Sequence, residues 1–384
     1  MLWLNFIHLY QPANSSSARI KEAADKSYWR LTRLLEENPS LFFTANISAC
    51  LLERLRDEGY EDLLESWRRL IKDGHLELVG SAAYHGFLPF LPTREVLYQI
   101  KRQEEIILEI LGVDVRGGGF FLPEMAYTPE LAKLVRQQGY SWLILDEAVL
   151  PKDAKNVNVC LDNNSDLKII IRHRSTSNAY LPDTLNKLSL ADQRPELIIT
   201  ATDAELYGLR HEDPTAELEK MVRIKDLRTQ TVSNFLQQQV DFPTLTLRSA
   251  SWETNQQSRR EQPFVIWRDR HNRVQTDLWH LAALALAAGE NYPNDPGYQW
   301  YRWHLNRGLA SCAFWWASGW DFFHNFGPVA WNPDEVENGL NDLVRSLRSL
   351  QDQRSLREKI KVEKLAAKIR RHLWELHWQK YWLK

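Results

Sequence analysis

Cysteine is scarce in this chain of 384 residues, which contains only Cys50, Cys160 and Cys312. These cysteines are far apart, odd in number and outside any CxxC spacing, so we expect reduced thiols rather than a disulfide framework. Long apolar runs are also missing, because no stretch reaches the ~18 uninterrupted apolar residues that a membrane-spanning helix needs. The first residues lack the basic and cleavable features of a signal peptide. These absences predict a soluble protein of the cytoplasm.

Net charge is nearly absent as well, since 48 Lys and Arg residues stand against 50 Asp and Glu residues. Without a basic patch or a block of like charges, a nucleic-acid or membrane partner is not expected. A phosphate-binding loop is also missing, because Gly117–Gly119 precede a strand rather than a helix N-terminus. His372 and His377 are five residues apart, a poor spacing for a metal site. We therefore expect neither a cofactor nor a metal.

Tryptophan, in contrast, is abundant, with 16 residues. A ring of this size is costly to expose, so it suits either a large core or a surface that stacks on flat ligands. Sugar rings present flat apolar C–H faces, and the tryptophan content is thus the first indication of a carbohydrate ligand.

Strand patterns alternate with helical patterns over the first two thirds of the chain. Strands are expected at 2–7, 41–46, 75–80, 117–122, 142–145, 167–172, 196–202 and 244–249. Such βα units indicate a parallel sheet, and their number predicts an α/β fold with a distorted (β/α)7-type barrel. Only helices are expected later, at 276–288, 297–318 and 334–380. We therefore predict a barrel catalytic domain over 1–270 and a helical domain over 271–384 that completes the active-site cleft.

The stretch Gly117–Tyr127 (GGGFFLPEMAY) places an acid at a strand end. An apolar run leads to Pro123, Glu124 follows at once, and Thr128–Glu130 then has the features of a helix start. In parallel α/β sheets and barrels, this edge is where reactive side chains gather. A solvated loop carboxylate remains the alternative interpretation of Glu124.

A second stretch, Leu197–Gly208 (LIITATDAELYG), repeats this arrangement. Its strand delivers Asp203 at the carboxyl end, with Glu205 two residues later. Two carboxylates on separate strands are what glycoside hydrolysis requires, one at the sugar C1 centre and one to move a proton to and from the glycosidic oxygen. Keeping one of them protonated near neutral pH requires burial or a like charge nearby.

Five short motifs follow one another along the chain. They are His8–Pro12 (HLYQP), Glu77–Gly80 with Tyr84, His85 and Pro89, Glu124 within GFFLPE, Asp203 within TDAELYG, and Ala317–Phe323 (ASGWDFF) after Trp315 and Trp316. In this order they resemble the five motifs of glycoside hydrolase family 57, whose members act mainly on α-glucans. Ser251–Thr254 and the later PFVIWRD also resemble family sequence, so the resemblance extends over residues 1–330.

The resemblance implies a retaining enzyme of the α-amylase type that cleaves α-1,4 linkages in an α-glucan or maltooligosaccharide. Glu124 would be the nucleophile that forms a covalent glycosyl-enzyme, and Asp203 would be the general acid/base. Transfer to a second sugar, by a branching enzyme or a 4-α-glucanotransferase, is the alternative activity, because water and a sugar hydroxyl can both act as acceptor.

Other residues in or beside the motifs are candidates for substrate binding. They are His8, Gln11, His85, Glu205, Trp252, Trp316, Trp320 and Asp321. The histidines and Gln11 would hydrogen-bond sugar hydroxyls, and the tryptophans would stack on sugar rings. Structural roles remain open for them, since a His at a strand end is often satisfied internally and a Trp pair on one helix face can be core.

Two other classes of protein compete with a glycosidase. A metal-dependent polysaccharide deacetylase would use a similar barrel but needs an Asp and two His ligands, and the chain contains no HxxxH or HxxEH pair. A non-catalytic glycan-binding protein would need the aromatic residues alone. The pair Glu124 and Asp203 favours an enzyme over this second alternative.

Overall fold

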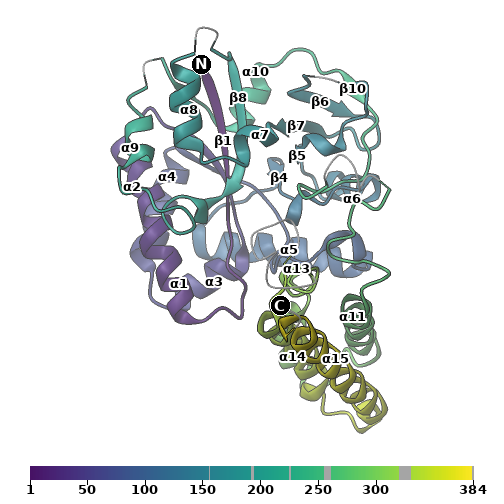
Figure 1. Ribbon diagram of the computed structural model, residues 1–384. Coiled ribbons are helices and arrows are strands. Elements are labelled where there is room, and N and C mark those ends of the chain that lie inside the picture. The colour runs from purple at the N-terminus through teal and green to yellow at the C-terminus, as the bar shows by residue number, and fades with distance from the viewer. Residues whose placement is uncertain (155, 192–193, 225, 255–260, 320–329, 383–384) are drawn as a thin grey trace. The chain divides into compact units, whose positions relative to one another are not determined.

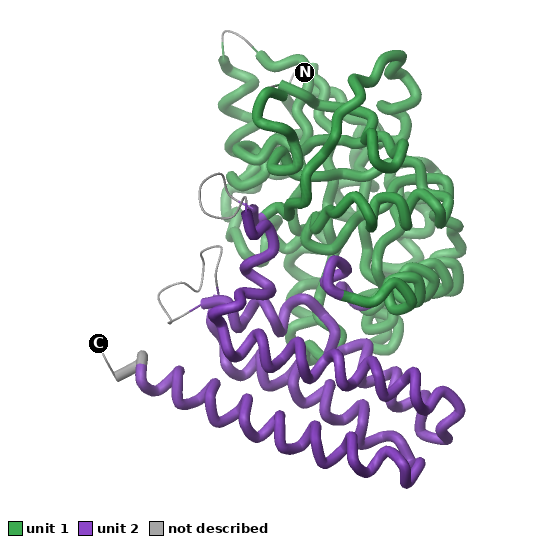
Figure 2. The backbone as a smooth tube through the Cα atoms, turned by 90° about the vertical axis from the view of Figure 1, so that its right-hand side faces the viewer, with its two compact units in different colours: residues 1–83, 91–252 green, residues 84–90, 253–384 purple. Residues whose placement is uncertain are grey.

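The protein folds into two compact units, which Figure 2 shows in different colours. The computed structural model describes the chain except for residues 155, 192–193, 225, 255–260, 320–329 and 383–384. Unit 1 comprises Met1–Ala83 and Leu91–Trp252, and unit 2 comprises Tyr84–Phe90 and Glu253–Lys384. The division therefore lies earlier than the boundary after residue 270 that the sequence predicted, and a short earlier segment also belongs to unit 2.

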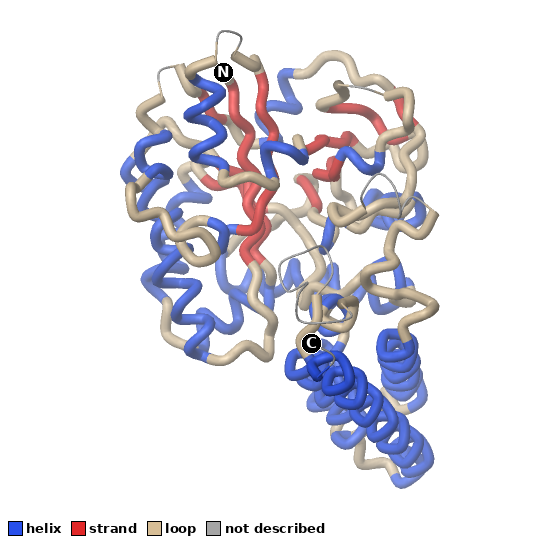
Figure 3. The backbone as a smooth tube through the Cα atoms, in the orientation of Figure 1, coloured by secondary structure: helices blue, strands red, loops and turns tan. Residues whose placement is uncertain are grey.

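The strands of the described residues all lie in unit 1, where they form two sheets (Figure 3). The first sheet contains β1 (Leu2–Leu9), β2 (Phe43–Ile47), β3 (Leu76–Leu78), β8 (Leu197–Asp203) and β9 (Arg228–Thr229). The second contains β4 (Gly119–Phe120), β5 (Trp142–Asp146), β6 (Val159–Asp162), β7 (Lys168–Arg172) and β10 (Thr244–Leu245). The pairings in the first sheet are parallel, and β1 is buried almost throughout, as expected for a parallel strand covered on both faces.

Backbone hydrogen bonds join the two sheets at both edges. At one edge, the Gly80 amide after β3 donates to Gly119 O (3.0 Å), and the Phe121 amide donates to Gly80 O (2.8 Å). At the other, the His173 amide after β7 donates to Ile199 O of β8 (2.8 Å). The strands therefore follow one another in the order β1-β2-β3-β4-β5-β7-β8, which agrees with the predicted distorted seven-stranded barrel.

Apolar side chains from both sheets meet in one core. Leu4 and Phe6 of β1 belong to it together with Phe121, Trp142 and Ile199, and none of these is more than 2% exposed. The rings of Phe6 and Phe121 stack with their centroids 5.4 Å apart. Burying each such side chain stabilises the fold by about 1.5–3 kcal/mol. Because the interior is filled, polar chemistry is left to the ends of the strands.

Helices connect the strands of unit 1 and lie around them (Figure 1). They are α1 (Ser17–Ala23), the π-helical turn Ala24–Tyr28, α2 (Trp29–Glu37), α3 (Ala49–Asp57), α4 (Glu61–Lys72), α5 (Thr93–Leu111), α6 (Pro129–Gln137), α7 (Arg174–Ser177), α8 (Leu181–Ser189), α9 (Glu217–Met221) and α10 (Val232–Gln238). The start of α6 confirms the predicted signals, because the Leu131 amide donates to the Thr128 hydroxyl (3.2 Å) and Pro129 occupies the first turn.

Unit 2 is helical in its described part. Its helices are α11 (Arg273–Asn291), α12 (Tyr298–Gly308), α13 (Ser311–Trp315), α14 (Pro333–Ser349) and α15 (Leu356–Trp382), with α14 packed against the other four. The single helices predicted over 297–318 and 334–380 are each divided in two. The break between α14 and α15 has a clear cause. The Asp295 carboxylate accepts hydrogen bonds from the Gln351 and Asp352 amides, and these bonds hold the backbone there in a non-helical conformation. None of the described helices is both long and apolar enough to cross a membrane.

Three strands differ from the sequence prediction. β9, which is only two residues long, was not predicted. β6 was not predicted, and it pairs with β7 in antiparallel orientation. Its half-buried alternation is short and bordered by asparagines, which hides the strand pattern in the sequence. Of the strand predicted over 244–249, only Thr244–Leu245 pairs with a neighbour, because this segment lies at the edge of its sheet.

The pairing of β4 with β5 depends on a close approach at Gly119. A Cβ atom added to Gly119 would lie 2.2 Å from Cζ2 of Trp142, an indole that is 2% exposed and donates to the Ser233 hydroxyl (3.0 Å). We expect Gly119→Ala to lower the free energy of unfolding by about 1–3 kcal/mol through overpacking, measured by urea denaturation. Gly118→Ala is the matched control, because its nearest described neighbour would be 3.4 Å away. Equal effects of the two substitutions would contradict this account.

Candidate active site

Three adjacent strands of unit 1 carry polar side chains at their carboxyl ends. In the parallel register, the Cα of His8 on β1 pairs with that of Asp203 on β8 and with that of Asn46 on β2. Parallel strands end at the same edge, so these side chains are brought together. The Nδ1 atom of His8 lies 2.8 Å from Asn46 Oδ1, and this hydrogen bond orients the imidazole.

Glu124 follows β4 through a strained turn. Its φ of 62° and that of Met125, 48°, lie in the left-handed region, which costs a residue other than glycine about 1–3 kcal/mol. Trp252 holds this turn at two points: its amide donates to Glu124 O (3.1 Å), and its indole N–H donates to Glu124 Oε2 (2.9 Å). Glu124 is only 9% exposed. The carboxylate is thus fixed in one orientation at the end of the strand.

Aromatic rings connect His8 with the surroundings of Glu124. The His8 ring stacks on Phe121, with centroids 4.6 Å apart, and meets the edge of Trp252 at 6.3 Å. Burial lowers the pKa of His8, although the nearby Asp203 charge and the Asn46 hydrogen bond act in the opposite direction. His8 is therefore neutral at neutral pH, with one nitrogen able to donate and one able to accept a hydrogen bond.

The Asp203 carboxylate forms an ion pair with Arg210, whose Nη1 donates to Oδ2 at 2.5 Å. Burial by itself would raise the pKa of Asp203, but Arg210 above all, together with His8 and Arg172, outweighs it and holds the pKa below its ordinary value. The Arg210 side chain is 58% exposed, so the pair faces solvent on one side. In the free protein, Asp203 is consequently kept ionised.

The Glu205 carboxylate is turned inward, which changes the interpretation made from the sequence. It is 1% exposed and accepts hydrogen bonds from the Tyr28 hydroxyl, from Gln11 Nε2 (3.1 Å) and from the Tyr10 amide (3.4 Å). Burial is the main cause that raises the pKa of Glu205. Glu205 and Gln11 were predicted to contact substrate; in the structure they hydrogen-bond each other, and Glu205 holds the segment that follows β1.

The other predicted site residues belong to unit 2. His85 is 3% exposed, has a left-handed φ of 54°, and its Nδ1 lies 2.9 Å from the Ser311 hydroxyl. Trp316 is half-buried, and its ring meets that of Trp315 with centroids 4.6 Å apart. Trp320 and Asp321 lie outside the described residues. Within unit 1, the structure brings the predicted residues His8 and Asp203 together by strand register, and Glu124 and Trp252 by hydrogen bonds.

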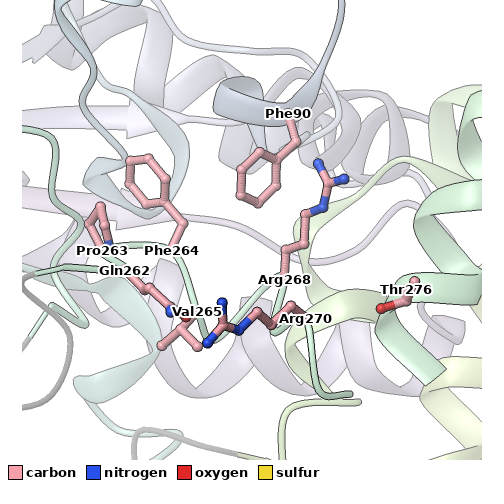
Figure 4. Close-up of a pocket in the computed structure, with 8 residues that line it drawn as sticks. All are labelled: Phe90, Gln262, Pro263, Phe264, Val265, Arg268, Arg270 and Thr276. Atoms are coloured by element: carbon pink, nitrogen blue, oxygen red, sulfur yellow. The ribbon is translucent and has the colours of Figure 1, made fainter. Parts of the chain in front are cut away.

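Unit 2 contains a cavity of about 530 Å³ that includes none of the residues predicted for the site (Figure 4). Phe90 and Phe264 contribute rings to its wall, and the Arg268 guanidinium lies 5.3 Å from the centroid of Phe90. No described Asp or Glu lines this cavity. It therefore lacks the acid pair that glycoside hydrolysis requires.

The sequence was compared with known protein families. The family model of glycosyl hydrolase family 57 matches residues 3–243, which is more than half of the chain. The chain belongs to glycosyl hydrolase family 57. The predicted membership of this family is thereby confirmed, and the match includes four of the five motifs, since Ala317–Phe323 lies beyond residue 243.

Curated relatives of this family 57 chain carry two kinds of name. The α-amylase of Pyrococcus furiosus is 34% identical over 149 residues, covering 38% of this chain and 22% of the relative. The 4-α-glucanotransferase of Thermococcus litoralis is 33% identical over 147 residues, with the same coverage of 38% and 22%. The matched region thus spans about a fifth of the length of these relatives.

Solved structures share the fold over nearly the whole chain. The 4-α-glucanotransferase from Thermococcus litoralis has a TM-score of 0.72 at 19% identity and covers 92% of this chain and 59% of that one. The family 57 branching enzyme from Pyrococcus horikoshii has a TM-score of 0.68 at 14% identity and covers 95% and 94%. These similarities confirm the predicted α/β fold with a C-terminal helical region.

Two residues that contact the predicted site were missed in the sequence. Asn46 ends the predicted second strand, so the strand-end rule that selected Glu124 and Asp203 could also have selected it. The sequence indicates Arg210 less clearly than Asn46. Its one local feature is that it follows a turn, in which Gly208 has a φ of 102°. Only the folded turn brings Arg210 back to Asp203, and sequence spacing does not reveal that.

The buried Glu205 gives a stability prediction. Tyr28→Phe removes the hydroxyl that donates to this carboxylate, and we expect the free energy of unfolding to fall by about 1–3 kcal/mol because a buried acceptor loses a partner. Chemical denaturation measures the change. Tyr60→Phe is the matched control, since the Tyr60 hydroxyl makes no hydrogen bond to a described residue. If both variants lose the same stability, Glu205 does not depend on Tyr28.

Proposed function

We propose that this family 57 chain is a retaining glycoside hydrolase that cleaves α-1,4 linkages in α-glucans. The observation that carries the proposal is the pair of carboxylates at the carboxyl ends of β4 and β8, with Glu124 fixed by Trp252 and Asp203 paired in register with His8. A pair of this kind is the machinery of glycoside hydrolysis. The α-amylase name of relatives more than 30% identical supports the substrate class.

Glu124 would act as the nucleophile. Its attack on C1 would form a covalent glycosyl-enzyme, and the C–O bond to the leaving sugar would break in the same step. The hydrogen bond from the Trp252 indole holds one carboxylate oxygen in place. Fixing the nucleophile before substrate binds lowers the entropic part of the activation barrier.

Asp203 would act as the general acid and then as the general base. It would give a proton to the departing glycosidic oxygen and later take one from the incoming water. Arg210 favours the ionised form of Asp203, which suits the base step. The acid step needs the protonated form, so activity should fall at pH values above the pKa of Asp203.

Glucan transfer is the second candidate function. The relatives named 4-α-glucanotransferase are as similar to this chain as those named α-amylase, at 33% against 34% identity over nearly the same length. Both reactions use the same glycosyl-enzyme and differ only in the acceptor. Hydrolysis releases reducing ends, whereas transfer conserves them.

The first prediction for this proposal concerns the two carboxylates. We expect Glu124→Gln and Asp203→Asn each to lower kcat/KM on maltoheptaose or amylose at least ~100-fold, because an essential nucleophile or acid/base is lost. Glu130→Gln is the control, since Glu130 is exposed in the helix that follows Glu124. Product chromatography measures the rates and separates shortened from rearranged glucans.

The stereochemistry of the first product provides a further check. A retaining reaction releases the α-anomer, which proton NMR detects before mutarotation. Early release of the β-anomer would rule out the covalent intermediate, and full activity of either carboxylate variant would rule out the assigned roles.

The second prediction concerns the pH profile. Arg210→Met removes the cation paired with Asp203, so the pKa of Asp203 should rise and the general acid should stay protonated to higher pH. An exposed ion pair is worth about 0.2–1 kcal/mol. Its loss should therefore shift the basic limb of the pH profile of kcat/KM to higher pH by roughly half a pH unit. His8, Arg172 and Glu205 also face Asp203 and remain in place.

Arg116→Met is the matched control for this profile. Arg116 forms a similar exposed ion pair with Asp114, at 2.6 Å, in the segment that leads into β4. Its removal should leave the basic limb unchanged. A basic limb that stays in place or moves to lower pH in Arg210→Met would contradict the assignment of Asp203 as the acid.

A further inference from the structure

A buried cation, Arg172, lies beside the candidate site and has no role in the reaction described so far. It is the last residue of β7 and only 5% exposed. Its Nε donates to Asp146 Oδ2 at 2.7 Å, and its Nη1 donates to Ala201 O at 2.9 Å. A buried guanidinium is costly unless its donors are satisfied, so these contacts fix the group in one position.

The Asp146 carboxylate holds two arginine side chains. Asp146 is fully buried at the end of β5 and accepts hydrogen bonds from Arg172 and also from Arg174, whose side chain is 20% exposed. Two guanidinium groups therefore share one carboxylate. This shared carboxylate holds the Arg172 side chain at the end of β7.

Arg172 also contacts the residue that fixes Glu124. Its Cζ lies 5.5 Å from the centroid of the Trp252 ring, a cation–π contact in a buried setting. Trp252 in turn donates its indole N–H to Glu124 Oε2 (2.9 Å). A continuous series of contacts thus runs from Asp146 through Arg172 and Trp252 to the Glu124 carboxylate.

The same guanidinium acts on the strand that carries Asp203. Ala201, which accepts its Nη1 hydrogen bond, lies two residues before Asp203 on β8. Backbone hydrogen bonds between the end of β7 and β8 are sparse, and one of them runs from the His173 amide to Ile199 O. Arg172 bridges the junction with its side chain, and its charge contributes to holding the pKa of Asp203 low.

We propose that Arg172 is a positioning residue for both carboxylates: held by Asp146, it orients Trp252 against Glu124 and anchors the end of β8 that carries Asp203. This inference rests on the proposed function for the roles of Glu124 and Asp203. Arg172 itself touches neither carboxylate in the described contacts and acts through Trp252 and the β8 backbone.

Two substitutions of Arg172 separate the effect of its positioning contacts from the effect of its charge. We expect Arg172→Met to lower kcat on maltoheptaose by up to about 100-fold, as for a misplaced nucleophile, and to move the basic limb of kcat/KM upward by about half a pH unit. His8, Arg210 and Glu205 around Asp203 stay in place in this variant. Arg172→Lys keeps the charge but not the planar guanidinium, so it should lose kcat while the basic limb stays where it is.

Arg174→Met is the matched control, because it removes the second guanidinium from the same Asp146, while the contacts to Ala201 O and to the Trp252 ring come from Arg172. It should keep kcat within about 3-fold of the wild type. A loss of stability alone would affect both arginine variants and would not move the pH limb. If Arg172→Met does not fold, Arg172→Lys decides the matter, and unchanged kcat in that variant would overturn the proposal.

A crystal structure of an Arg172 variant tests the proposal independently of turnover. We expect the Trp252 indole to leave Glu124, so that the Nε1–Oε2 distance exceeds the present 2.9 Å by more than 0.6 Å, the limit of a hydrogen bond. An unchanged distance would overturn the positioning role even if the wild type shows no activity on α-glucans. Inactivity of the wild type would reject the proposed function alone.

Discussion

The parallel register of β1 decides where chemistry can occur in unit 1. It places His8 beside Asp203 on one side and beside Asn46 on the other, at the edge where all three strands end. A slip by one residue would turn His8 to the opposite face of the strand, because side chains alternate along it. The interior behind this edge is filled with apolar rings. Polar groups can therefore be presented only at the ends of the strands.

Two carboxylates that are two residues apart have opposite electrostatic environments. Asp203 pairs with the exposed Arg210 and has a lowered pKa, whereas Glu205 is enclosed by Tyr28 and Gln11 and has a raised pKa. The difference arises from the turn after β8, which directs one side chain to the rim and the other into the protein. A divergence of this kind is typical of sites where acid and base functions are separated by environment.

Strain at Glu124 is compensated by contacts from distant parts of the chain. Two consecutive residues in the left-handed region would not persist in an isolated turn, because other backbone conformations cost less. Trp252 provides two hydrogen bonds to this turn, and Arg172 packs on the Trp252 ring. The conformation that presents the carboxylate is thus a property of the assembled unit 1.

The amino-acid sequence by itself determined the α/β class, most strand positions, the α6 start signals and the family motifs, because these depend on patterns within a few residues. It also located Glu124, Asp203 and His8, since each is a polar residue directly after or at the end of an apolar strand. Tertiary structure alone decided that Glu205 is internal and that Arg210 and Arg172 reach the site. Those contacts depend on side-chain directions and on residues far apart in the chain, such as Arg172 and Trp252, and local spacing carries no information about either.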